Sequence, residues 1–106
     1  MYAVIFEVEI TNEKKDQYLD IAAMLKEQLV KMPGFISIER FQSLVNEGKL
    51  LSLSFWENEE SLLVWKKNID HMSAQKKGRD SIFKDYRIRI AKIERDYTLE
   101  SSTFVD

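Results

Sequence analysis

The sequence predicts an α+β fold in which strands and helices follow one another in the order β-α-β-β-α-β. Two observations support this prediction. In several segments apolar and polar side chains alternate, which is the period of a half-buried strand. Between them apolar residues recur every three or four positions, which is the period of an amphipathic helix. The chain has 106 residues, of which 44% are hydrophobic and 32% charged, and this is typical of one globular domain. We therefore expect a four-stranded antiparallel sheet with both helices on one face.

A strand and a long helix are predicted at the start of the chain. In residues 2–10 apolar side chains stand at every second position, which predicts a strand with one buried face. Thr11 or Asn12 is suited to cap a helix, and Pro33-Gly34 is suited to end it, because proline cannot continue the helical hydrogen bonds. The apolar stripe of this helix is formed by Tyr18, Ile21, Ala22, Leu25, Leu29 and Met32.

A β-hairpin is predicted in the middle of the chain. Residues 35–45 and 50–56 are rich in β-branched, aromatic and other apolar residues, and Asn46-Glu47-Gly48 between them is a turn signal. In the second strand apolar residues alternate with serines, so we expect the apolar side chains to face the helices and the serines to face the other way. The apolar residues are Leu51, Leu53 and Phe55, and the serines are Ser52 and Ser54.

A second helical region and a fourth strand are predicted in the last part of the chain. Asn58 is suited to cap the helix. Asn68-Ile69-Asp70 indicates a break, after which Asp70 would cap a second short helix that runs to Lys77. Residues 86–97 alternate again, and the change of parity at Ala91 indicates a bulge or twist. The whole arrangement is ferredoxin-like.

Composition excludes several classes of function. Sixteen basic and eighteen acidic residues give a net charge of -2, without the basic excess that nucleic-acid binding usually leaves. No cysteine is present, which excludes disulfides and thiolate sites. No apolar run approaches the roughly 20 residues that span a bilayer, and the N-terminus lacks the features of a signal peptide. We therefore expect a cytoplasmic protein that binds neither nucleic acid nor membrane.

One face of the predicted sheet has no helix to cover it. Extended apolar surface is rarely left in water, so we expect this face to pack against a second copy and form a homodimer. Ile36, Ile38 and alternate residues of the fourth strand are expected in that contact. The domain is predicted to cover residues 1–97, and the tail over residues 98–106 to be either frayed or exchanged with the partner.

Several stretches of the sequence resemble a known family. SFWENEESLLVWKK, followed by HMSAQKKGRDSIFKDYRIRIAKIERDY, resembles the antibiotic biosynthesis monooxygenase (ABM) domain family. The likeness is closest to a bacterial branch with the segments W-E-S-x-E-A-x-x-W and H-x-x-A-Q-x-x-G-R. MPGFISIERF is similar to the P-G-F start of that family's second strand. The resemblance implies a dimeric α+β barrel, in which two sheets pack face to face and each subunit has a pocket between its sheet and its helices.

The resemblance implies two kinds of activity. Some members oxidise aromatic polyketides without a metal, a flavin or another prosthetic group, whereas others bind heme and degrade it. The heme-degrading members use an asparagine in the first strand, a tryptophan in the second helical region and a histidine ligand further along. Trp65 matches the tryptophan, but Phe6-Glu7-Val8 stands where the asparagine is expected. The ligand position falls near Gln75, with His71 one helical turn earlier. Heme degradation is therefore not expected, while heme binding through a displaced histidine stays open.

We therefore expect a small monooxygenase that acts on an aromatic or quinone-like molecule with no cofactor. The alternative is a non-catalytic dimer that binds heme or another small molecule. The single histidine and the absence of cysteine give no basis for a metal site.

The candidate site combines one base with aromatic and polar side chains. The imidazole of His71 titrates near neutral pH, so it is expected to accept a proton from a substrate hydroxyl. Gln75 lies four residues further along and shares a helix face with His71. Gln75 and Arg79 are expected to bind developing negative charge. The expected apolar walls and floor are Trp56, Trp65, Phe6 and Phe55. Core packing is the alternative role of the tryptophans, and a bond to a backbone carbonyl or to water is the alternative for His71.

Overall fold

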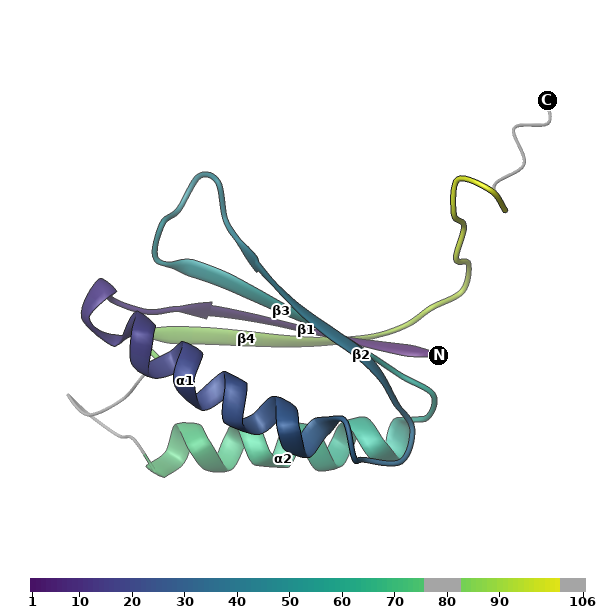
Figure 1. Cartoon of the computed structure of the whole chain (residues 1–106), viewed down its shortest axis with the longest axis horizontal. Helices are drawn as coiled ribbons and strands as arrows, with labels where there is room; N and C mark the ends of the chain where they lie inside the picture. The colour runs from purple at the N-terminus through teal and green to yellow at the C-terminus, as the bar shows by residue number, and fades with distance from the viewer. Residues whose placement is uncertain (76–82, 102–106) are drawn as a thin grey trace.

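The computed structural model of the chain describes the backbone of residues 1–75 and 83–101, and the side chains of these residues except for 69–75. Within this part of the chain, helices and strands follow in the predicted order (Figure 1). Their bounds are β1 (Tyr2–Glu9), α1 (Asn12–Leu29), β2 (Phe35–Gln42), β3 (Lys49–Trp56), α2 (Glu59–Gln75) and β4 (Asp85–Lys92). The strands form an antiparallel sheet in the order β2-β3-β1-β4, and both helices lie on the same side of it (Figure 1). The predicted ferredoxin-like fold is confirmed.

Local sequence signals account for the helix ends. Thr11 occupies the N-cap position of α1 with an extended backbone, although its side chain makes no capping hydrogen bond. Asn58 caps α2 as predicted, because its Oδ1 accepts a hydrogen bond of 3.0 Å from the backbone N–H of Ser61. After α1 the chain reverses at Gly34, whose φ of +83° lies in the left-handed region that glycine adopts without strain.

The predicted break in the second helical region is wrong. α2 continues through Asn68, Ile69 and Asp70. Their low helix propensity costs less than about 1 kcal/mol each, and a break would leave several backbone groups without their helical partners. The predicted end of a short helix at Lys77 lies outside the described residues. Neither α1 nor α2, as far as the structure describes them, is long and apolar enough to cross a membrane.

The strands also differ from the prediction in detail. β2 ends at Gln42 and β4 at Lys92, each short of its predicted end. Of the bulge or twist predicted at Ala91, the bulge is wrong, because β4 pairs with β1 in a regular register. The irregularity lies in β2 instead, between Phe35 and Ser37.

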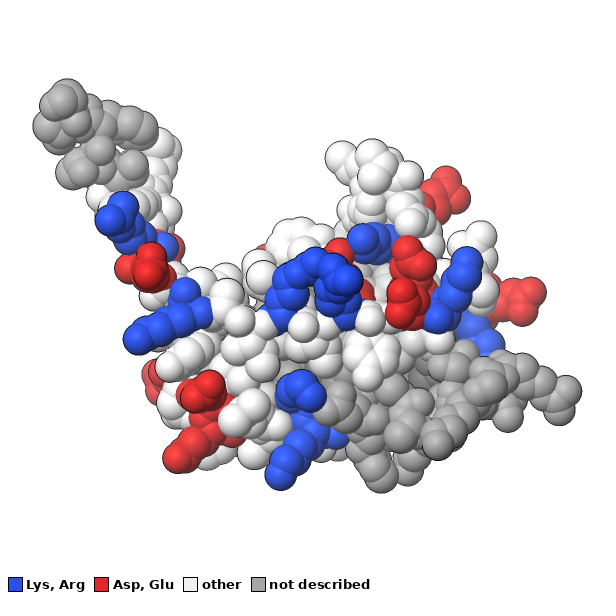
Figure 2. Space-filling view, turned by 180° about the vertical axis from the view of Figure 1, so that it is seen from behind, with Lys and Arg blue, Asp and Glu red and all other residues white. Residues whose placement is uncertain are grey.

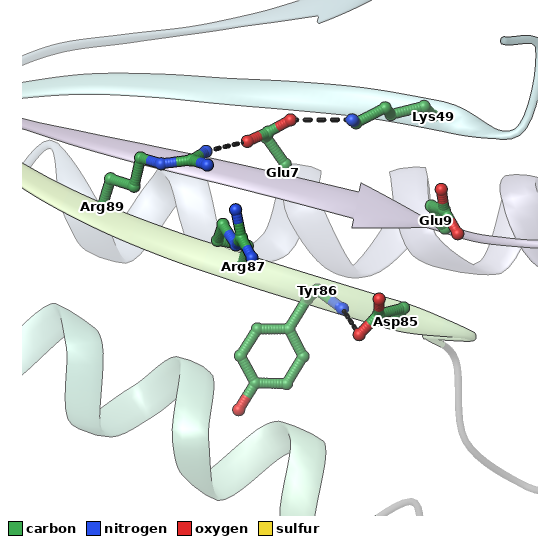
Figure 3. A pocket seen from close by; sticks show the side chains of 7 residues that line it. All are labelled: Glu7, Glu9, Lys49, Asp85, Tyr86, Arg87 and Arg89. Atoms are coloured by element: carbon green, nitrogen blue, oxygen red, sulfur yellow. Dashed lines mark hydrogen bonds and ion pairs between the residues drawn. The ribbon is translucent and has the colours of Figure 1, made fainter.

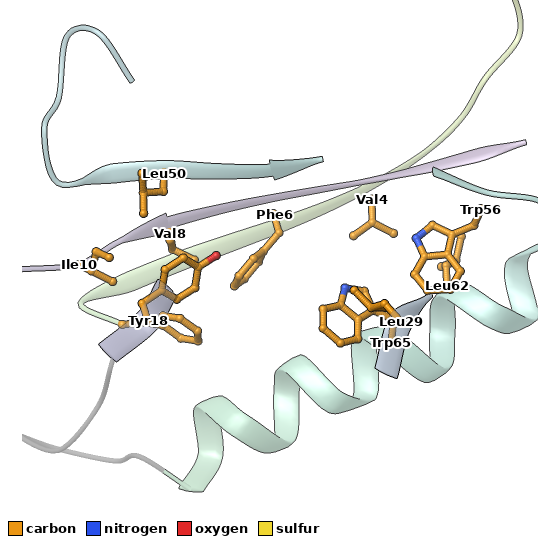
Figure 4. Close-up of a cluster of buried hydrophobic side chains, with 11 residues drawn as sticks. Val4, Phe6, Val8, Ile10, Tyr18, Leu29, Leu50, Trp56, Leu62 and Trp65 are labelled. Carbon is orange, nitrogen blue, oxygen red and sulfur yellow. The ribbon is translucent and has the colours of Figure 1, made fainter. Parts of the chain in front are cut away.

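The hydrophobic core lies between the sheet and the two helices. Val4, Phe6 and Val8 of β1 point toward the helices and are at most 4% exposed (Figure 4). The predicted stripe of α1 packs against them, which confirms that prediction. The buried members of the core are Val4, Phe6, Val8, Ile10, Tyr18, Leu29, Leu50, Trp56, Leu62, Trp65 and Phe83.

The two faces of β3 are exchanged relative to the prediction. Phe6 pairs with Ser52 and Val4 with Ser54, and residues directly opposite in an antiparallel pair share a face. The two serines therefore face the helices, where both are buried. The prediction was wrong because alternation shows which side chains share a face, but not which of the two faces the helices cover. The residues of β3 that point away from the helices include Leu51, Leu53 and Phe55.

The side of the sheet away from the helices, here called the open face, carries apolar and charged side chains. Its members are Ala3, Ile5, Glu7, Glu9, Ser37, Glu39, Phe41, Lys49, Leu51, Leu53, Phe55, Asp85, Arg87, Arg89 and Ala91. Ile36 is exposed, whereas Ile38 packs against the core, so the prediction that Ile38 lies on the open face is wrong. The β2–β3 hairpin and the segment after β4 both extend on this side of the sheet (Figure 1).

Candidate functional site

A small cavity lies between the helices and the sheet, on the side where the sequence predicted a pocket. Its volume is about 10 Å³, roughly the space that one water molecule needs. Both helices and three of the strands contribute to its lining. The lining residues are Phe6, Tyr18, Ile21, Ala22, Leu25, Arg40, Ser52 and Trp65. Apart from one arginine and two hydroxyl groups, this lining is apolar.

Two of the predicted site residues meet at this cavity. Phe6 reaches it from β1 and Trp65 from α2, and each is 4% exposed. Figure 4 shows both side chains in the space between the sheet and α2. Both also belong to the core, so the same residues serve packing and line the cavity.

Two other predicted residues lie elsewhere. Trp56 is fully buried but does not line the cavity. Its Nε1 donates a hydrogen bond of 2.9 Å to Ser54 Oγ, and its ring meets Phe35 edge-on at 5.3 Å between centroids. Its surroundings match the alternative role in core packing. Phe55 pairs with Ala3 on the open face, so the prediction that Phe6 and Phe55 form one floor is wrong.

The polar candidates fall where the structure gives no side-chain positions. His71 and Gln75 belong to the last turns of α2, but their side chains lie outside the described part, and Arg79 lies outside it altogether. Their roles stay predictions. Among the described side chains, no three histidine, aspartate or glutamate residues gather as a metal site would require.

Six described residues of the cavity were not predicted as site residues. Four of them, Tyr18, Ile21, Ala22 and Leu25, were recognised as part of the α1 stripe, and Ser52 was assigned to the opposite face. No sequence pattern marks Arg40 as a site residue, although it alternates with Ile38 along β2 and therefore faces the helices with it. The Arg40 Nε is buried and has no hydrogen-bond partner.

An aromatic cluster adjoins the cavity at the Phe6 side. The ring of Phe83 meets Phe6 at 5.6 Å and Tyr18 at 5.9 Å between centroids, both edge-on. Tyr86 of β4 lies 5.8 Å from both Phe6 and Phe83. Such pairs stabilise one another beyond simple burial. They fix the ring of Phe6, and with it one wall of the cavity.

A second group of polar residues lies on the open face, around Glu7. The Glu7 carboxylate forms an ion pair with Lys49 of β3 at 2.9 Å and another with Arg89 of β4 (Figure 3). The hydrogen bond from Lys49, followed by that from Arg89, lowers the pKa of Glu7 below its ordinary value. Glu7 thereby links the two strands that flank β1, and a hollow of about 280 Å³ lies beside it.

Comparison with known proteins supports the fold and identifies a family that matches the chain. Residues 1–77 match the family model described as antibiotic biosynthesis monooxygenase. The jasmonate monooxygenase ABM of Pyricularia oryzae is 43% identical over 93 residues, which cover 88% of this chain. The chain spans less than half of that relative, since the match covers 43% of the relative's length.

Solved structures with low sequence identity to this chain have the same fold. A candidate antibiotic biosynthesis monooxygenase from Deinococcus radiodurans superposes with a TM-score of 0.73 at 11% identity, over 93% of this chain and 98% of that one. The heme-degrader MhuD of Mycobacterium tuberculosis, in a structure with two hemes bound in its active site, gives 0.67 at 15% identity, over 92% and 100%. The family model covers more than half of the chain, and one relative exceeds 40% identity over most of it. The chain therefore belongs to the antibiotic biosynthesis monooxygenase family.

Proposed function

We propose that the chain is a monooxygenase that oxidises a small aromatic or quinone-like molecule, held between the sheet and the helices, without a metal or flavin. The single observation that carries the proposal is the cavity between the helices and the sheet. Rings of Phe6, Tyr18 and Trp65 line it, and aromatic walls suit a flat apolar ligand. Membership of the monooxygenase family supports the reaction class.

The cavity must enlarge to admit such a molecule. Pockets for ligands of this size hold about 300 Å³ or more, and the space here is about 10 Å³. Ile21 and Leu25 of α1 line it and are only half-buried. Displacement of these two side chains opens the cavity toward solvent without moving the sheet.

The proposed chemistry needs a base and a site for negative charge. His71 takes the proton from a substrate hydroxyl, and Gln75 and Arg79 hold the charge that develops. An anthrone is a suitable test substrate because oxidation of its CH₂ group by O₂ gives a carbonyl and water. In that reaction the substrate supplies all the electrons and no further reductant is consumed.

Oxygen uptake with a panel of anthrones and hydroquinones tests this proposal. We expect turnover by the wild type, loss of turnover in His71→Ala, and a raised KM in Trp65→Phe, which keeps an aromatic ring in the wall. Leu63→Ala, at an exposed position of α2, is the control and keeps wild-type rates. Turnover no faster than that of His71→Ala with every substrate would refute the proposal.

The alternative function is a dimer that binds heme or another small molecule without turnover. The likeness to MhuD favours this alternative only at the level of fold. The described lining does not fit heme, because it leaves about 10 Å³ and offers no imidazole, and no step of the reaction is derived through heme. A heme titration decides the matter: a Soret band that disappears in His71→Ala, together with no oxygen uptake, would replace the first proposal by this one.

We also propose that the open face is the contact of a homodimer. It combines Leu51, Leu53 and Phe55 with the charges around Glu7. Figure 2 shows the molecule hollowed between the hairpin and the C-terminal segment, with basic and acidic side chains at the floor. The hairpin tip carries Leu44 and Val45, which are 100% and 97% exposed, and a second copy seated in the hollow would cover such side chains.

Light scattering tests this proposal. We expect a dimer at micromolar concentration for the wild type and a monomer for Leu53→Glu, which places a charge in the middle of the apolar part of the open face. Leu63→Glu adds the same charge at an exposed position of α2 and should remain dimeric. A monomeric wild type would contradict the proposal.

A further inference from the structure

Among the described residues that line the cavity between the helices and the sheet, Arg40 is the one with a basic side chain. It lies on β2, directly opposite Ser52 of β3, and so projects from the sheet toward the helices. Apart from Ser52, the other described lining residues are aromatic or aliphatic, and the two helices contribute Tyr18 and Trp65. A side chain with a permanent positive charge, itself half-buried, therefore forms part of a mainly apolar lining.

The fold itself gives this charge no partner within the described part of the chain. The Arg40 Nε is shielded from solvent and makes no hydrogen bond. The ion pairs of the sheet are formed by Glu7 with Lys49 and Arg89, on the open face and not on this one. An unsatisfied buried donor is unfavourable, and more so when it carries charge. Packing alone would favour an apolar side chain of similar length at this position.

We propose that Arg40 is the anchor for an anionic group of the ligand, and that the ligand is an ionised carboxylic acid with an apolar body. This inference rests on the proposed function, since it names the substrate class for the same cavity. The carboxylate pairs with the guanidinium, which presents parallel N–H donors in a geometry that matches it. The apolar body then lies against Trp65 and Phe6.

The charge balance of the cavity favours a carboxylate over a phosphate. One guanidinium neutralises one negative charge, and the described residues that line the cavity include no second basic side chain. A phosphate carries between one and two negative charges at neutral pH, so part of its charge would stay buried and unpaired. The aromatic walls likewise suit a ligand that is mostly hydrocarbon.

Calorimetric titration with 1-naphthoate and with 1-naphthamide tests the proposal on the full chain. The two probes share the ring system and differ in charge. We expect the wild type to bind naphthoate at least about tenfold more tightly than naphthamide, and Arg40→Met to lose this preference while still binding the amide. Arg40→Lys keeps the charge but not the paired donors and should show an intermediate preference.

A matched control and a second measurement keep the test decisive. Arg87→Met removes the same charge from the open face and should leave the preference unchanged. Without ligand, Arg40→Met should unfold at a higher temperature than the wild type, because it removes a buried N–H donor that has no hydrogen-bond partner among the described residues.

Equal binding of the two probes, binding of neither, or a preference that survives in Arg40→Met would overturn the proposal. Its failure is distinct from failure of the monooxygenase proposal. Arg40-dependent binding of naphthoate with no oxygen uptake would refute only the reaction, and oxygen uptake by both wild type and Arg40→Met with unchanged KM would refute only the anchor.

Discussion

Replacing Gly34 with alanine tests how tightly α1, β2 and α2 are joined at one point. The φ of +83° at Gly34 would cost a residue with a Cβ atom about 1–2 kcal/mol. That Cβ would also lie 2.6 Å from Ser61 Oγ and 2.9 Å from Asn58 Nδ2. Ser61 Oγ cannot move without cost, because it donates a hydrogen bond to the Pro33 carbonyl that is worth about 1 kcal/mol. We therefore expect Gly34→Ala to lower the free energy of unfolding by about 2–3 kcal/mol.

Urea unfolding at fixed protein concentration, followed by tryptophan fluorescence, measures this loss. The same substitution in a Ser61→Ala background separates its two causes. There the hydroxyl is already absent, so Gly34→Ala should cost about 1 kcal/mol less than in the wild type. Equal costs in the two backgrounds would show that the contact with Ser61 contributes nothing. A loss below about 0.5 kcal/mol, the range of ordinary surface substitutions, would refute the left-handed turn itself.

Three further predictions concern the core and the open face. Ser54→Ala leaves the buried Trp56 Nε1–H without its acceptor, so urea unfolding should show a loss of about 1–3 kcal/mol, and an unchanged midpoint would contradict the bond. The pKa of Glu7 is lowered, mainly by the hydrogen bond from Lys49. The ionised Glu7 carboxylate therefore stabilises the fold fully above pH 4.5, the ordinary pKa, and this stabilisation is lost as the pH falls through the lowered pKa. The difference in unfolding free energy between wild type and Glu7→Gln should therefore shrink in acid, and a difference that is constant with pH would be evidence against the ion pairs. Trp65→Ala removes a ring that is 4% exposed and should lower the free energy of unfolding by about 3–5 kcal/mol. Val64→Ala, at an exposed neighbouring position, should lower it by no more than about 0.5 kcal/mol. Similar losses for the two variants would be inconsistent with the packing of α2.

Periodicity predicted the order of the elements because it reports which side chains share a face. The even positions of β1 and the stripe of α1 each identified a buried face correctly. It failed at β3, where Leu53 and Phe55 are more hydrophobic than Ser52 and Ser54 and yet point away from the helices. Either face of β3 can be buried, so hydrophobicity alone does not show which face the helices cover.

The candidate site was predictable only in part, because cavities depend on residues that are distant in sequence. Trp65 was found through a family motif and Phe6 through alternation. Arg40 could be recognised only once the register of β2 was known, since the irregularity between Phe35 and Ser37 decides which side chains of this strand face the helices. A register shift of that kind cannot be recognised from composition or from the spacing of apolar residues.

The parity of β1 has a practical consequence for protein engineering. β1 is hydrogen-bonded on both sides, to β3 and to β4, and its odd and even positions face opposite directions. Substitutions at Ile5 and at Phe6 are thus expected to alter separate properties, the first self-association and the second the chemistry of the cavity. An inserted or deleted residue in β1 would exchange the two sets of side chains at once. Length changes are therefore better placed in the hairpin loop between Gln42 and Lys49, which lies outside the paired residues of β2 and β3.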